Sequence, residues 1–366
     1  MKNNTFGCRG TKDRIGVLVA QLGTPDAPTK SALRRYLKQF LWDRRVIETN
    51  RALWWLNLNG IVLNTRPKRS ARLYKRIWWP EGSPLLKITE RQTHALKERC
   101  RALGEQVEVV FGMRYGNPSL ESAIDQLIES GCSRILLVPM YPQYSATTTA
   151  SIYDAAFAHL LRRRSVPALR VLAPYYRDRR YIEALSETIN QGLKALPYTP
   201  ERLVLSYHGI PIKYVTKGDP YCCMCVETTE AFRSRIEMPP ENIIHTFQSR
   251  FGRDPWLQPY TDKTVEALAQ EGIKKIAVAC PGFTADCLET LDEVGNEALE
   301  LFRHNGGEEL QLIPSVNDQP VFMDALFAIV KEELHGWLSP QCSPAACQGC
   351  PTQRELQLQA RAAGEK

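Results

Sequence analysis

The chain has 366 residues, of which 43% are hydrophobic and 24% are charged, the proportions of a globular protein and not of a disordered or fibrous one. A net charge of +7 suits anionic ligands without itself indicating nucleic acid, and 11 cysteines are too few for a disulfide scaffold and favour a reducing compartment. The polar N-terminus does not resemble a signal peptide, and no apolar stretch reaches the roughly 20 residues of a membrane span, so we expect a cytoplasmic protein.

Buried strands are indicated by eight short apolar runs rich in Val, Ile and Leu, which alternate with amphipathic helical stretches such as 119–129 and 262–270. In chain order, the runs begin near Ile15, Val107, Ile135, Leu169, Leu203, Ile243, Ile276 and Leu310. This alternation predicts mostly parallel sheets joined by right-handed crossovers.

A tryptophan-rich segment at 52–79 separates the first two runs. Its apolar first part contains Trp54 and Trp55, and a basic stretch follows with Arg66, Lys68, Arg69, Arg72, Lys75 and Arg76. One interpretation is a core helix followed by a solvated basic helix. The other is an apolar lip with a basic collar, which would suit an amphiphilic anion or a membrane surface.

The two halves of the chain carry three similar motifs in the same order. QLGTP (21–25) matches YHGIP (207–211), FGMRYG (111–116) matches FQSRFG (247–252), and an acidic residue near a glycine precedes the third and seventh runs. We therefore predict an α/β fold with two similar, doubly wound, Rossmann-like domains, each with a parallel four-stranded sheet. The expected domains are 1–165 together with 312–338, then 166–311, followed by a C-terminal extension at 339–366.

Ligands of open α/β sheets bind beyond the carboxyl ends of the strands, so the residues that follow each run are the candidates for a site. No glycine-rich nucleotide fingerprint occurs there. His208 ends the fifth run, where an imidazole can accept a proton or ligate a metal near neutral pH. The alternative is a structural histidine.

An acidic stripe follows the seventh run. Glu289, Glu293, Glu297 and Glu300 recur at helical spacing, so a helix would place them on one face, and Asp286 precedes them. Such a stripe is often only a solvated face. Here no basic residue within the stripe relieves the repulsion, and the stripe begins at the ligand-binding edge, so we favour a path for a divalent cation.

A further group of candidates offers hydroxyl groups and a cation. YPQYSATTT (141–149) follows the third run, and Arg114 with Tyr115 could meet a carboxylate. For Tyr141 and Tyr144, core packing is the alternative.

Taken together, these segments resemble the ferrochelatases, which insert ferrous iron into protoporphyrin in the last step of haem biosynthesis. The resemblance covers roughly residues 15–338 and rests on GSPL (82–85), YPQYS (141–145), SYHGIP (206–211), KGDPY (217–221), TFQSRFG (246–252), DPWL (254–257) and ADCLETL (285–291). It implies a porphyrin cleft between the two domains, protoporphyrin IX and Fe²⁺ as substrates, and peripheral contact of the 52–79 lip with the inner face of a membrane.

The resemblance also implies roles for individual residues. His208 and Glu289 match the catalytic pair of the family and are expected to contact the metal, with His208 as proton acceptor and Glu289 on the other side of the ring. The residues expected to carry the metal or protons are Asp286, Glu293 and Glu297. The residues expected to contact the porphyrin are Arg114, Tyr115, Tyr144 and Ser145.

Three cysteines cluster near the C-terminus: Cys342, Cys347 and Cys350. Many ferrochelatases hold a [2Fe–2S] cluster through four thiolates, three of them in a C-terminal extension, so the resemblance implies these three as ligands. The fourth ligand of the animal pattern falls on Ala146, which leaves Cys225 as a candidate. Zinc binding and free thiols are the alternatives.

Other functions stay open. A cobalt chelatase of the same fold tends to use a pair of histidines, whereas this chain offers His208 with Glu289. Coproporphyrin, with four carboxylates, would need more cations around the cleft. A non-catalytic haem or metal carrier, or a redox sensor, is the alternative from another class.

The chain departs from the animal ferrochelatases at Cys287, where those enzymes have His. We interpret Cys287 as a small packing residue.

Overall fold

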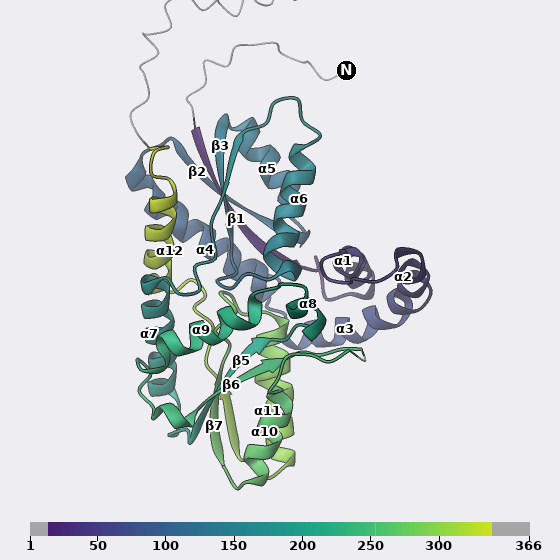
Figure 1. Cartoon of the computed structure of the whole chain (residues 1–366), viewed down its shortest axis with the longest axis vertical. Coiled ribbons are helices and arrows are strands. Elements are labelled where there is room, and N and C mark those ends of the chain that lie inside the picture. The colour runs from purple at the N-terminus through teal and green to yellow at the C-terminus, as the bar shows by residue number, and fades with distance from the viewer. Residues whose placement is uncertain (1–13, 253, 339–366) are drawn as a thin grey trace, which may run out of the picture.

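The computed structural model of the protein describes residues 14–252 and 254–338, and its described part contains two four-stranded parallel sheets (Figure 1). The first contains β1 (Arg14–Thr24), β2 (Val107–Gly116), β3 (Cys132–Pro139) and β4 (Ala168–Val171), in the order β2-β1-β3-β4. The second contains β5 (Arg202–His208), β6 (Ile243–Gln248), β7 (Lys275–Ala279) and β8 (Glu309–Leu312), in the order β6-β5-β7-β8. Each strand starts at or just before a predicted run, so the predicted fold class is confirmed.

The end of the first sheet lies beyond the boundary expected from the sequence. β4 pairs with β3, with Leu136 opposite Arg170. Residues 168–171 therefore complete the first sheet, although a boundary at 165 would assign them to the second half. A division after Val171 fits the two sheets.

One apolar core joins the two sheets. Ile15 and Val17 of β1 belong to the same buried cluster as Leu203 and Leu205 of β5. The long helices whose residues contribute to this cluster are α4 (Pro84–Cys100), α7 (Arg179–Ala195), α9 (Tyr221–Arg233) and α12 (Pro320–Glu333). Because the shared core is continuous, the two sheets form one packed body, with these helices along one side of it (Figure 1).

The other face of each sheet has its own helical layer. The first sheet is covered by α5 (Leu120–Glu129) and α6 (Ser151–Leu160), and the second by α10 (Thr261–Gln270) and α11 (Ala298–His304). Each sheet thus has helices on both faces, as a doubly wound fold requires. Three further short helices connect these elements: η2 (Arg101–Leu103), α8 (Ile212–Thr216) and η4 (Pro240–Asn242).

The segment at 52–79 forms part of a projecting lip, which consists of α1 (Lys30–Trp42), α2 (Arg51–Asn57), the π-helix η1 (Leu58–Val62) and α3 (Leu63–Ile77) (Figure 1). α1 and α3 enclose a small apolar cluster that also contains Tyr115 of β2 and touches Leu288 and Leu291 of the second half. α2 buries none of its residues. Of the described helices, none is long and apolar enough to cross a bilayer.

The structure corrects the alignment of one predicted repeat. The backbone N–H of Met113 donates to the carbonyl of Pro118, and that of Phe247 donates to Pro259, both at 2.8 Å. Met113 is therefore the counterpart of Phe247, whereas the motif match paired Phe111 with Phe247, two residues away. The correction arises because the Arg-aromatic-Gly resemblance is local, while strand register is set by backbone hydrogen bonds.

This register also pairs the ends of the central strands. Gln21 lies opposite Met113, and Tyr207 lies opposite Phe247. One residue further along, Leu22 is therefore the counterpart of His208, as QLGTP and YHGIP predict.

Candidate active site at the carboxyl ends of the second sheet

His208 is the last residue of β5 and is partly buried. Its Nδ1 lies 2.6 Å from the carbonyl oxygen of Gly209. Because a carbonyl only accepts hydrogen bonds, Nδ1 carries the proton in this contact. The lone pair of the neutral imidazole is then on Nε2, which can accept a proton or bind a metal.

Gln248, at the end of β6, connects His208 with Glu289. It is the Cα partner of His208 in the strand pair, and its Nε2 donates to the carbonyl oxygen of Glu289 at 2.9 Å. Its Oε1 accepts from Ser206 Oγ at 2.5 Å. The buried amide therefore fixes the backbone of Glu289 against the strand end that carries His208.

Glu289 lies close to tyrosines of the first half of the chain. Burial, the larger cause, and the charge of Glu289 together raise the pKa values of Tyr36, Tyr74 and Tyr141 well above their usual value. These tyrosines come from α1, α3 and the segment after β3. The Tyr141 hydroxyl is buried and lacks a hydrogen-bond partner within the described residues. Glu289 therefore lies where the two halves meet.

The predicted acidic helix exists, but its first part is a π-helix. η5 (Glu289–Glu297) leads directly into α11. A π-helix has more residues per turn than an α-helix, so positions four apart still lie on one side. Glu289, Glu293 and Glu297 therefore share a side, as the spacing predicts, while the exposed Glu300 pairs with Arg76 at 3.2 Å.

Glu293 lies largely buried on this helix, next to the charge of Glu289. Burial first, and then the charge of Glu289, raise its pKa to about 7. Ser249 opposes this shift by donating a hydrogen bond from Oγ to the Glu293 carboxylate. The pKa of the exposed Glu297 is raised too, by burial and by Asp292. Glu293 can therefore change its protonation state near neutral pH.

Asp286 is placed differently from the other acidic residues. It is 5% exposed, and its two carboxylate oxygens accept hydrogen bonds from Thr290, Ser315 and Asn317. Its surroundings do not support the predicted role as a carrier of metal or protons, because such a group must be accessible.

Arg114 and Tyr115 belong to a polar network behind the lip. Arg114 Nη2 and Tyr115 Oη donate to one oxygen of Asp43, at 2.5 and 2.8 Å, and Ser151 Oγ donates to the same oxygen at 2.6 Å. Arg114 Nε also donates to the carbonyl oxygen of Ser151 at 2.9 Å. These bonds engage Nε and Nη2 of Arg114 and the hydroxyl of Tyr115, so the surroundings of these groups do not support direct contacts from them to a porphyrin.

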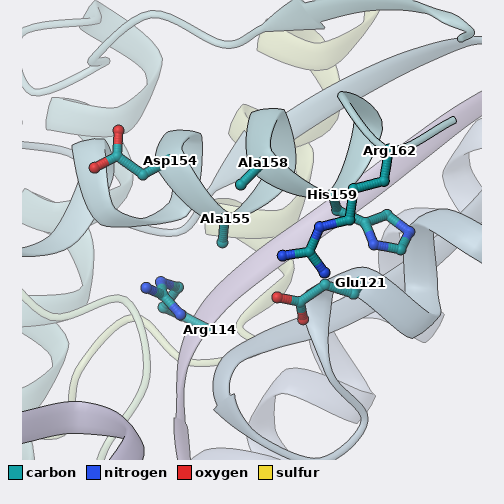
Figure 2. Close-up of a pocket in the computed structure, with 7 residues that line it drawn as sticks. All are labelled: Arg114, Glu121, Asp154, Ala155, Ala158, His159 and Arg162. Carbon is teal, nitrogen blue, oxygen red and sulfur yellow. The ribbon is translucent and has the colours of Figure 1, made fainter. Parts of the chain in front are cut away.

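Arg114 also lines a small surface pocket between α5 and α6, with Glu121, Asp154, Ala155, Ala158, His159 and Arg162 (Figure 2). Figure 2 shows both acidic and basic side chains along this pocket. Its volume of about 280 Å³ is below the roughly 300–1,000 Å³ of common ligand sites. It is therefore too small to enclose a tetrapyrrole.

The segment after β3 is tied to the second half through Asp219. Ser145 is 1% exposed, and its Oγ donates to Asp219 Oδ2 at 2.9 Å, while the N–H of Ala146 donates to the same oxygen at 2.7 Å. Ser145 therefore positions the start of the π-helix η3 (Ala146–Ala150). Tyr144 beside it is only partly buried and remains accessible to a ligand.

Cys225 does not fit the predicted role as a cluster ligand. It is fully buried in the shared core, and burial raises the pKa of its thiol well above the usual value, whereas a ligand must be an accessible thiolate. Cys342, Cys347 and Cys350 lie outside the described residues. Cys287 is buried with Leu85 and Ile88, which agrees with its interpretation as a packing residue.

Sequence reasoning missed Tyr36 and Tyr74, and it did not predict that Gln248 bonds the backbone of Glu289. Tyr36 and Tyr74 place a phenol on the otherwise apolar buried faces of α1 and α3, a weak signal that could have marked them. Gln248 lies within a motif that carries the family resemblance, but its bond to the backbone of Glu289 depends on a contact 41 residues away.

This chain is similar to known ferrochelatases. The family model described as "Ferrochelatase" matches residues 14–334. A ferrochelatase from Bradyrhizobium sp. is 52% identical over 329 residues, which cover 89% of this chain and 93% of the relative. One from Marinobacter nauticus is 46% identical over 349 residues, covering 95% of this chain and 94% of the relative. The solved structure of SirB from Bacillus subtilis with Fe³⁺ matches in fold alone, with a TM-score of 0.52, 14% identity, and coverage of 88% of this chain and 97% of that one.

Proposed function

The chain belongs to the ferrochelatase family, and from this premise we propose that its site inserts Fe²⁺ into protoporphyrin IX, forming protohaem and releasing two protons. The macrocycle would lie at the carboxyl ends of the strands, where ligands of doubly wound sheets bind. His208 and Glu289 would act on it there. Fe²⁺ is a substrate of this reaction.

The observation that carries this proposal is the bridge formed by Gln248. A single buried amide is the strand neighbour of His208 and donates to the backbone of Glu289 at 2.9 Å. Gln248 therefore contacts the backbones of both residues, one of which carries an imidazole and the other a carboxylate. Metal insertion needs both, because two pyrrole protons must leave as one cation arrives.

The division of labour follows from the surroundings of the two groups. His208 would accept a pyrrole proton at Nε2, since the carbonyl of Gly209 keeps Nδ1 protonated, and would meet the metal first. Glu289 would act from the other side of the ring. Glu293, with a pKa raised to about 7, would pass protons or metal between Glu289 and the exposed Glu297.

Lip cations would bind the two propionates of protoporphyrin. Arg76 of α3 is already paired with Asp292 and Glu300. Arg66 and Arg69, on the same helix, have no carboxylate at ion-pair distance in the described part of the chain. Burial and the charge of Arg69 lower the pKa of Arg66, so a bound anion would relieve the repulsion between the two arginines.

The test is an anaerobic assay with Fe²⁺ and protoporphyrin IX, read by the absorbance of the metalloporphyrin. We expect turnover by the wild type, and losses of about 10²–10⁴-fold in His208→Ala and Glu289→Gln. Glu300→Gln, at the solvent end of the stripe, is the matched control and should stay active. Turnover that persists in both site variants would overturn the site assignment.

The same assay separates the alternatives. Coproporphyrin run in parallel tests the choice of tetrapyrrole, and Co²⁺ with a corrin precursor tests cobalt chelatase activity. A wild type that binds protoporphyrin without any turnover would favour a haem or metal carrier.

We also propose that the lip contacts an anionic membrane surface. Leu53, Trp55, Leu56 and Ile61 are each more than half exposed, and the basic collar of α3 lies next to them in sequence. Exposed apolar side chains beside arginines and lysines suit a lipid interface. Trp55→Ser with Leu56→Ser should weaken binding to vesicles containing phosphatidylglycerol. Phe157→Ser with Leu161→Ser, at exposed apolar residues near the end of α6, is the control.

A [2Fe–2S] cluster held by Cys342, Cys347 and Cys350 remains a proposal without a fourth ligand, since the buried Cys225 does not fit. We derive no reaction step through it. Freshly purified protein without absorption between about 400 and 600 nm and without bound iron would exclude the cluster.

A further inference from the structure

The loop that leads into η5 is held by a buried amide–carboxylate pair, Asn317 and Asp286. The backbone N–H of Asp286 donates to Asn317 Oδ1 at 2.8 Å, and Asn317 Nδ2 donates to Asp286 Oδ2 at 2.7 Å. Two hydrogen bonds in opposite directions fix both the separation and the orientation of the two residues.

The other oxygen of Asp286 reaches the first turn of η5. Asp286 Oδ1 accepts from Thr290 Oγ1 at 3.0 Å and from the N–H of Ser315 at 3.2 Å. The Thr290 hydroxyl in turn accepts from the N–H of Cys287 at 3.1 Å. Thr290 is fully buried. Glu289 is therefore enclosed by a set of bonds that runs from residue 286 to residue 290.

The pair is anchored to the first half of the chain. Gln92 of α4 is fully buried, and its Nε2 donates to the carbonyl oxygens of Thr284 and Asn317, at 2.7 and 2.8 Å. Asn317 has a φ of 43°, a left-handed conformation that asparagine adopts more readily than most residues. One side chain of α4 thus holds both segments that carry the pair.

We propose that Asn317 and Asp286 are positioning residues that fix the start of η5 and so aim the Glu289 carboxylate at the metal and the macrocycle. Gln248 independently holds the carbonyl oxygen of Glu289 at 2.9 Å. The backbone of Glu289 is then fixed from two directions, and its side chain retains its rotamers as the main freedom. This inference rests on the role proposed for Glu289.

The same contacts separate Asp286 from the metal and proton path. Its hydrogen bonds in the structure go to Thr290, Ser315 and Asn317. Its charge would then matter only as the acceptor of these bonds. A carboxylate that relays protons or metal would need its own charge at position 286, whereas a positioning residue needs only a complementary partner.

Exchanging the two side chains tests this difference. In Asn317→Asp, two carboxylates face each other, and kcat should fall by about 10²-fold, the effect of a misplacement of about 1 Å. The KM for protoporphyrin should change little, because α3 and the lip are untouched. In Asn317→Asp with Asp286→Asn, the amide and the carboxylate have changed places. The same bonds can form, and most of kcat should return.

Two further variants keep the test decisive. If Asn317→Asp does not fold, as judged by circular dichroism, the exchanged double variant still reports on the pair. Thr290→Val removes the bonds of the Thr290 hydroxyl to Asp286 and to the N–H of Cys287, leaves the Asn317–Asp286 pair in place, and should lower kcat more mildly. A folded double variant that stays as inactive as Asp286→Asn alone would overturn the proposal, and so would full kcat in both single variants. Activity in Glu289→Gln would instead contradict the function proposed for Glu289.

Discussion

The ends of β1 and β5 occupy equivalent places in their sheets but differ in chemistry. Leu22 precedes Gly23 in one, and His208 precedes Gly209 in the other. By the same register, Arg114 is the counterpart of Gln248. Arg114 donates to the backbone of Ser151 beside η3, and Gln248 donates to the backbone of Glu289 at the start of η5, both at 2.9 Å. The frame is therefore repeated, down to a π-helix after the third strand of each sheet.

What differs is how the polar groups of each half are used. In the first half, Arg114, Tyr115 and Ser151 all donate to the nearly buried Asp43. In the second half, the Nδ1 contact of His208 leaves Nε2 available, and the charge of Glu289 helps to raise the pKa of Glu293, while Arg76 pairs with Asp292 and Glu300 further along the helix. The two halves therefore share a backbone arrangement and differ in their side chains. In the first half the polar groups bond one another around Asp43, whereas in the second half His208 and Glu293 can still exchange protons.

The largest expected effect comes from moving the imidazole between the halves. Leu22→His combined with His208→Leu places it at the equivalent end of β1, where it no longer has Gln248 as its strand partner. We expect kcat to stay about 10²–10⁴-fold below wild type, as in a variant without the imidazole. The measurement is iron insertion at saturating substrates. Recovered activity would mean that the two strand ends are interchangeable.

A second prediction contrasts the two bridging residues. Gln248→Leu removes the bond to the Glu289 backbone, so kcat should fall by up to about 10²-fold. Arg114→Leu leaves Asp43 without its cation and should lower the free energy of unfolding by about 3 kcal/mol, with a smaller effect on kcat. Measuring kcat and urea unfolding for both variants tests this contrast. If both variants lost kcat and unfolding free energy to the same extent, the two bridging residues would not differ in role, and the contrast between the halves would be wrong.

The smallest effect concerns His245, whose counterpart in the first half is Phe111. Burial lowers the pKa of His245 to about 4, from an ordinary value of 6.5. The native state therefore keeps His245 neutral. The contribution of this residue to the free energy of unfolding is fully present above pH 6.5 and is lost as the pH falls toward 4. The loss should reach about 2 kcal/mol at pH 5.

His245→Phe should remove this pH dependence, because phenylalanine does not titrate. The check is urea unfolding of wild type and variant at pH 7 and pH 5. His245 stacks on Tyr207 with ring centroids 4.8 Å apart, so the aromatic contact can persist. An unchanged difference between the two pH values in the variant would show that other groups cause it.

The strands and the catalytic candidates were predictable because their signals are local. Apolar runs mark buried strands, His208 ends one such run, and Glu289 belongs to the ADCLETL motif (285–291) that carries the family resemblance. The π-helices were not predictable, since a π-helix and an α-helix place residues four apart on much the same side and differ mainly in backbone hydrogen bonds.

Long-range partners explain the other differences between sequence and structure. Nothing near Arg114 in the sequence points to Asp43, which lies 71 residues away and takes up its charge. Asp286 precedes the acidic stripe in sequence, yet its carboxylate accepts a hydrogen bond from Asn317, 31 residues later. Ser145 similarly bonds Asp219, 74 residues away. Sequence spacing indicates which residues share a helix face, but not which of them tertiary contacts neutralise.

The most direct test of the central claim is a crystal structure with a bound metalloporphyrin. The account predicts a macrocycle at the carboxyl ends of the strands, with His208 Nε2 facing the metal from one side and Glu289 from the other. Propionates should reach toward Arg66 and Arg69 of the lip. A macrocycle bound elsewhere, or one whose metal is remote from both His208 and Glu289, would contradict the account.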